Sequence, residues 1–191
     1  PFVRIPQIEY HFIARCMDMG ALGVMVPNVK NGDEARCVVD AVKYAPEGKR
    51  GVSLAACHTD FASVETASYL RFSNTNTTVI CQIESVEGLE NIEAIADTPG
   101  VDVLWVGHFD LTQSMGIPGQ MEHPQLLGAL KKVIDTARRK ELAASIQPDC
   151  MEDARKWTDM GFNVMSYGCD HIVYRDALRD AVQELRGLKK M

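Results

Sequence analysis

The sequence predicts an α/β fold, namely a (β/α)8 TIM barrel that lacks roughly its first two strand–helix units in these 191 residues. Three observations support this prediction. Short apolar segments typical of buried parallel strands alternate with amphipathic segments typical of helices. Five complete strands and one shorter strand segment can be counted, and each precedes a helix. Two junctions, residues 17–24 and 158–164, nearly repeat the same order of helix end, glycine and strand.

The structural alternative to a barrel is an open, doubly wound sheet. Neither G-x-G-x-x-G nor G-x-x-x-x-G-K-[ST] follows any predicted strand, which weakens the nucleotide-binding forms of that sheet. We therefore favour the barrel. The chain is then a single domain, residues 1–191, equivalent to the C-terminal three quarters of a barrel of about 250 residues.

The first half of the chain contains three predicted strands. They are apolar runs at residues 2–5, 22–26 and 78–84. Apolar residues at helical spacing predict a helix that ends near Gly20, and Asn31 begins the next helix. Residues 45–62 are expected to form a long loop, and a helix at residues 63–72 with a polar connection leads to the third strand.

The second half continues the alternation. Further strands are predicted at residues 101–106, 142–146 and 162–167. Residues 111–120 are expected to be a loop with a short helical turn, because they contain two glycines and a proline. The predicted helices are residues 86–96, 123–140, 151–160 and 172–188.

Composition limits the classes of partner. The net charge is −6 and no block of basic residues is present, so nucleic-acid binding is not expected and a small-molecule substrate is favoured. No apolar run approaches the roughly 20 residues of a membrane span. The six cysteines are scattered without C-x-x-C spacing, which favours reduced thiols and a cytoplasmic location.

Candidate functional residues follow from the barrel, because its active site lies where strands end. These positions are Arg4, Pro27, Asn28, Gln82, Glu84, residues 107–110, Gln147, Asp149 and residues 167–170.

Glu84 and Asp110 stand out among these positions. Each ends a nearly unbroken apolar run, so the two carboxylates could share a hard divalent cation. The alternative is that each is a surface charge or a helix cap, and Asp110 is a good cap candidate. Gln82 lies on the same side of its strand as Glu84 and could face the same ligand, or could belong to a polar layer inside the barrel.

Several motifs resemble the HpcH/HpaI aldolase family. They are residues 1–4, 18–27 and 44–52, Gln82-Ile83-Glu84, and residues 106–111, in the family's order and spacing over nearly the whole chain. This family comprises metal-dependent class II pyruvate aldolases such as 4-hydroxy-2-oxoheptanedioate aldolase and 2-dehydro-3-deoxyglucarate aldolase. The resemblance implies a lyase that reversibly cleaves a 4-hydroxy-2-oxo acid into pyruvate and an aldehyde through a metal-bound pyruvate enolate.

The resemblance also implies residue roles. Glu84 and Asp110 would hold Mg, Mn or Co, and Arg4 would stabilise the enolate oxygen as a catalytic residue. Gln82, Phe109 and Asp110 would bind the substrate. Asp18 matches the aspartate that partners the family's general-base histidine.

Three departures from the family are visible. Its general-base histidine lies upstream of the arginine, and none of the five histidines here matches that place. His108 stands where the family usually has proline, and strand alternation is expected to point it away from Asp110. Phe109 replaces the usual alanine or serine, which could narrow the aldehyde pocket.

Two alternative functions remain open. The first is a citrate-lyase β-like or macrophomate-synthase-like activity, including decarboxylation of oxaloacetate-type substrates. The second is a catalytically incomplete barrel that binds only metal and a keto acid. The resemblance further implies a homo-oligomer, a hexamer or trimer of dimers, in which the last helix packs across subunits. Its apolar positions equally fit packing within one chain.

Overall fold

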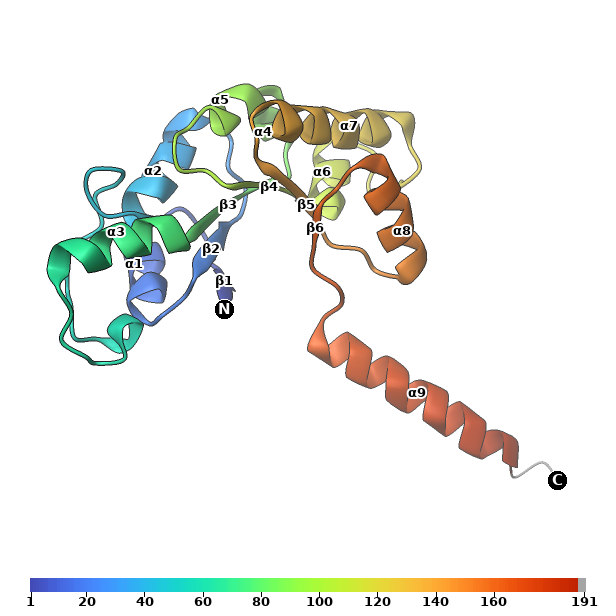
Figure 1. Cartoon of the computed structure of the whole chain (residues 1–191). Coiled ribbons are helices and arrows are strands. Elements are labelled where there is room, and N and C mark those ends of the chain that lie inside the picture. Colours follow the sequence, from blue (N-terminus) through green and yellow to red (C-terminus); the bar gives the residue numbers. More distant parts are fainter. Residues whose placement is uncertain (189–191) are drawn as a thin grey trace.

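The computed structural model describes residues 1–188. Its six strands form one parallel sheet (Figure 1). The strands are β1 (Phe2–Arg4), β2 (Gly23–Val26), β3 (Thr78–Ile83), β4 (Val103–Val106), β5 (Ala143–Ile146) and β6 (Val164–Met165). They pair in sequence order, from β1 to β6. A doubly wound sheet would reverse its strand order, so this sheet is part of a barrel wall and the open-sheet alternative is wrong.

The connections between strands are mainly helical. The longer helices are α1 (Tyr10–Asp18), α2 (Gly32–Val42), α3 (Thr66–Asn76), α7 (Pro124–Arg139), α8 (Met151–Met160) and α9 (Asp170–Leu188). The shorter ones are η1 (Cys57–Thr59), α4 (Val86–Glu90), α5 (Ile92–Ala96) and α6 (His108–Ser114). Asn31 caps α2 as predicted, because its side chain accepts a hydrogen bond from the Glu34 backbone N–H.

The two faces of the sheet differ in what they contact. The outer face packs against the helices and forms the main core, with fully buried side chains such as Val24, Cys81 and Leu104. The inner face carries a smaller cluster of Ile80, Val103 and Trp105, with Met25 and Ala143 against it.

Strand register arranges the inner face in layers. Met25, Ile80, Val103 and Ala143 are register partners along neighbouring strands. Gln82, Trp105 and Ser145 form the next layer toward the carboxyl ends. The period of two residues then places Glu84, Gly107 and Gln147 in a third layer, at the carboxyl ends of the strands.

Three local predictions were wrong. The helix predicted at residues 63–72 spans Thr66–Asn76, because the Asn74 side chain bonds the Tyr44 backbone and holds the polar segment in helical form. The segment 111–120, predicted as a loop with a short helical turn, overlaps α6, which spans His108–Ser114 and so begins earlier than predicted. The last strand is only Val164–Met165, shorter than the predicted 162–167.

Helix α9 extends away from the rest of the chain (Figure 1), and none of its residues is buried. Its apolar side chains, including Val173, Leu178 and Leu185, are exposed. Packing of this helix within one chain is therefore not observed. Within residues 1–188, no helix combines the length and the apolar character that a membrane span requires.

Candidate active site

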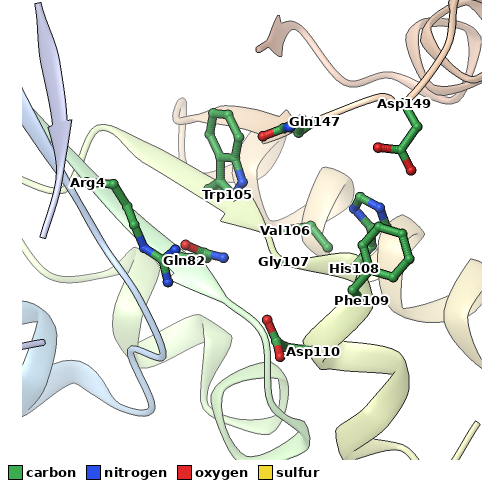
Figure 2. Close-up of a pocket in the computed structure, with 10 residues that line it drawn as sticks. All are labelled: Arg4, Gln82, Trp105, Val106, Gly107, His108, Phe109, Asp110, Gln147 and Asp149. Atoms are coloured by element: carbon green, nitrogen blue, oxygen red, sulfur yellow. The ribbon is translucent and has the colours of Figure 1, made fainter. Parts of the chain in front are cut away.

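A cavity of about 280 Å³ lies at the carboxyl ends of the strands (Figure 2). Its lining residues come from four strand ends and the segments that follow them. They are Arg4, Gln82, Trp105, Val106, Gly107, His108, Phe109, Asp110, Gln147 and Asp149. Most of these positions were predicted from the strand ends. Trp105 was not, because it lies one layer deeper and reads in the sequence as part of an apolar strand.

Gln82 and Glu84 form a buried polar pair at the end of β3. They are two residues apart, so both project to the inner side of the sheet. The Gln82 Nε2 group donates a hydrogen bond to Glu84 Oε2 at 2.5 Å. The Gln82 Oε1 atom is buried without a hydrogen-bond partner in the described part of the chain. A buried amide oxygen without a partner favours a role in binding a donor.

Gly107 provides the space that this pair occupies. A Cβ at this position would lie 2.5 Å from Glu84 Oε2, 2.6 Å from Gln82 Nε2 and 2.7 Å from Glu84 Cβ. Ordinary Cβ contacts begin at 3.4 Å. The absence of a side chain at Gly107 therefore allows the Glu84 carboxylate to lie directly against the β4–α6 junction.

Asp110 approaches Glu84 from that junction. It lies in the first turn of α6, whose cap residue is Gly107 without a side-chain cap bond, so the prediction of Asp110 as a cap was wrong. Burial and then the Asp110 charge raise the pKa of the Glu84 carboxyl, while Arg4 and the Asn28 backbone N–H oppose the rise. Two acids that disfavour each other's charge are suited to sharing a cation.

Arg4 ends β1 and points toward Gln82 across the cavity (Figure 2). It also lines a neighbouring hollow of about 500 Å³ that contains Lys30, Glu84 and Asp110. The guanidinium therefore lies on the same side of the sheet as both carboxylates. Its permanent charge and fixed donors are suited to an oxygen that becomes negative during a reaction.

The donor set fits a hard cation better than zinc. Among residues 1–188 there is no group of three or more His, Cys, Asp or Glu side chains that could hold a metal. Glu84 and Asp110 are two oxygen donors, and Mg²⁺ commonly binds through one or two carboxylates while keeping waters and substrate oxygens. Structural zinc sites instead use four protein ligands.

His108 and Phe109 form the opposite side of the cavity. The His108 ring is 6% exposed and packs edge-on against Trp157, with 5.1 Å between ring centroids. Burial lowers the pKa of its imidazole, which Asp149 and Asp153 partly oppose. His108 lies away from Asp110 as expected (Figure 2), but the reason expected for this was wrong. Residues two apart in a strand face the same side, and it is the turn of α6 that separates these two side chains. Phe109 is 55% exposed beside it.

Asp18 is not part of this cavity. Asp18 ends α1, which returns from the carboxyl end of β1 to the amino end of β2. It therefore lies near the amino-terminal ends of the strands, away from the cavity. There its carboxylate accepts a 2.5 Å hydrogen bond from the buried Arg50 guanidinium. The direction of a helix that follows a strand could have predicted this placement.

A family model described as HpcH/HpaI aldolase/citrate lyase matches residues 1–177. The 5-keto-4-deoxy-D-glucarate aldolase of Escherichia coli (strain K12) is 36% identical over 177 residues, which are 93% of this chain and 68% of that protein.

Two solved structures are also similar, each with a TM-score of 0.90 over 97% of this chain. One is an HpcH/HpaI aldolase from Desulfitobacterium hafniense DCB-2, 30% identical, of which 71% is covered. The other is an HpcH/HpaI aldolase/citrate lyase family protein from Burkholderia cenocepacia J2315, 32% identical, of which 73% is covered. The family model and these relatives agree with the partial barrel, and the chain belongs to the HpcH/HpaI aldolase/citrate lyase family.

Proposed function

We propose that the protein is a divalent-metal-dependent aldolase that reversibly cleaves a 4-hydroxy-2-oxo acid into pyruvate and an aldehyde. The observation that carries the proposal is the arrangement of Gln82, Glu84 and Asp110 around Gly107, with Arg4 facing them. The E. coli relative, named for a deoxy-keto diacid, supports the same reaction class.

Each polar residue has a role in this proposal. Glu84 and Asp110 hold the cation, which when bound supplies Lewis-acid stabilisation of the keto and carboxylate oxygens. The Arg4 guanidinium donates hydrogen bonds to the keto oxygen as it becomes an enolate oxygen. The backbone N–H groups of Phe109 and Asp110, in the first turn of α6, bind the substrate carboxylate. Gln82 orients Glu84 through its donor and contacts the substrate through its other amide atom.

Cleavage also requires a base. A base removes the proton of the 4-hydroxyl group, the C3–C4 bond breaks, and the aldehyde leaves behind the pyruvate enolate, which is then protonated at C3. The family resemblance assigns this base to a histidine upstream of Arg4, and none of the five histidines in this sequence matches that place. The role of Asp18 as the partner of that histidine stays a prediction.

A second candidate function uses the same half of the site. Decarboxylation of oxaloacetate releases CO₂ and leaves the same enolate without any base. The family description, which joins aldolases with citrate lyase, favours retaining this activity as an alternative.

The proposal extends to the assembly and location of the enzyme. We propose a homo-oligomer in which a second copy covers the exposed apolar side chains of α9. We also propose that the enzyme works in the cytoplasm on small keto acids and aldehydes, because all six cysteines are free.

Two assays separate the halves of this proposal. Oxaloacetate decarboxylation with Mg²⁺ or Mn²⁺, corrected for the rate with free metal, tests the enolate half. Cleavage of 4-hydroxy-2-oxo acids tests the complete site. We expect EDTA and Glu84→Gln to abolish both activities. Metal-independent turnover would contradict the proposal, and no turnover under any metal would favour a binding-only barrel.

A further inference from the structure

The cavity has two chemically different ends. Glu84, Asp110 and Arg4 lie around one end, where the proposed enolate forms. The other end is lined by His108, Gln147 and Asp149 (Figure 2), which the proposed enolate chemistry does not use.

Three separate segments build this second end. His108 comes from the first turn of α6, where Trp157 holds its ring in place. Gln147 follows β5 on the inner side of the sheet, and its Nε2 group donates to Cys169 Sγ at 3.7 Å. Asp149 precedes α8, and its carboxylate faces the His108 ring (Figure 2). The end therefore offers an imidazole, an amide and a carboxylate to one ligand.

We propose that this end binds the aldehyde half of the substrate and selects an uncharged hydroxyaldehyde over an aldehyde that carries a carboxylate. The inference rests on the proposed aldolase function and specifies its substrate class. It concerns His108, Gln147 and Asp149 as specificity-determining residues.

Size and charge support this choice. The whole cavity, at about 280 Å³, is near the lower bound of small-molecule sites, so a short aldehyde fits beside pyruvate. Hydroxyl groups can donate to the Asp149 carboxylate and accept from the Gln147 or His108 donors. Among the lining residues in the described chain, Arg4 is the only Lys or Arg, and it lies at the enolate end. The carboxylate of a charged aldehyde would therefore lie near the Asp149 carboxylate without a neighbouring cation to offset the repulsion.

The neighbouring hollow differs from the cavity in containing a lysine. It shares Arg4 and Asp110 with the cavity and is also lined by Lys30, whose Nζ is 3.4 Å from Glu87 Oε2. A carboxylated aldehyde bound there would depend on Lys30 and not on Asp149. Aldehyde binding beside Asp149 and aldehyde binding beside Lys30 therefore predict different effects of substitutions at these two residues.

The test uses two aldehydes of equal length, glycolaldehyde and glyoxylate. Glycolaldehyde carries a hydroxymethyl group where glyoxylate carries a carboxylate. Oxaloacetate with Mn²⁺ supplies the enolate, so no base is needed. C3 of the enolate forms a bond to the aldehyde carbon, the carbonyl π electrons move to its oxygen, and that oxygen takes a proton from solvent. Trapped 4-hydroxy-2-oxo acid is measured by chromatography as a fraction of the CO₂ released.

We expect the native protein to trap glycolaldehyde in preference to glyoxylate. Asp149→Asn should shift the trapping ratio toward glyoxylate by about tenfold. The matched control is Asp153→Asn, which removes a nearby acid that does not line the cavity and should leave the ratio unchanged.

Two results would overturn the inference while decarboxylation is intact. One is that the native protein traps glyoxylate preferentially and that Lys30→Gln abolishes this trapping. The other is that neither aldehyde is trapped. Absence of metal-dependent decarboxylation would instead refute the proposed function itself.

Discussion

Replacing Gly107 by alanine tests whether the space at this residue positions the metal site. Its φ of −88° is open to alanine, so the substitution adds only the Cβ. That atom would lie 2.5 Å from Glu84 Oε2, where ordinary contact begins at 3.4 Å. Glu84 must therefore retreat by about 1 Å, a displacement that can reduce catalysis by about 100-fold. We expect that loss in oxaloacetate decarboxylation, together with weaker Mn²⁺ binding.

The protein should still fold, because two of the three crowded atoms end flexible side chains. We expect a loss of about 1–3 kcal/mol in the free energy of unfolding. Gly128→Ala is the matched control, since Gly128 lies in α7 with no atom near the added Cβ. It should keep full activity and gain about 0.5–1 kcal/mol of stability. Native activity and Mn²⁺ affinity in Gly107→Ala would refute the reasoning.

Three further predictions concern stability, each measured by chemical denaturation. Lys43→Met should cost about 2–4 kcal/mol, because the buried Lys43 ammonium donates to the backbone oxygens of Asn74 and Thr77, which would lose their partner. Asn31→Ala should cost about 1 kcal/mol through loss of the α2 cap, whereas Asn31→Asp should cost little. The raised pKa of Glu84 means that the metal-free folded protein keeps this proton above the ordinary 4.5. Its unfolding free energy should therefore fall as pH rises from 4.5 through the folded pKa, and Glu84→Gln should remove that slope.

Strand positions were predictable because buried parallel strands leave a direct apolar signal. The same period of two residues placed Gln82 and Glu84 on one side of β3. Local structure that depends on hydrogen bonds between distant segments was not predictable. The helical form of the polar segment before β3 depends on Asn74 bonding Tyr44, which is 30 residues away.

The candidate site was predictable in its residues more than in its geometry. The family resemblance raised Glu84, Asp110 and Arg4 above other strand-end residues, and the structure places all three together. The start of α6 at His108 was hidden, because the cap residue is a glycine without a side-chain signal. Trp105 was hidden because an inner-layer residue and an outer-face residue look alike in an apolar run.

The central claim is that Glu84 and Asp110 act as one cation site. The most direct measurement is Mn²⁺ binding, followed by electron paramagnetic resonance, in the native protein, Glu84→Gln, Asp110→Asn and the double variant. We predict that each single variant loses at least about 100-fold in affinity and that the double variant loses little more, because two ligands of one ion act as a unit. Native Mn²⁺ affinity in either single variant would contradict the claim.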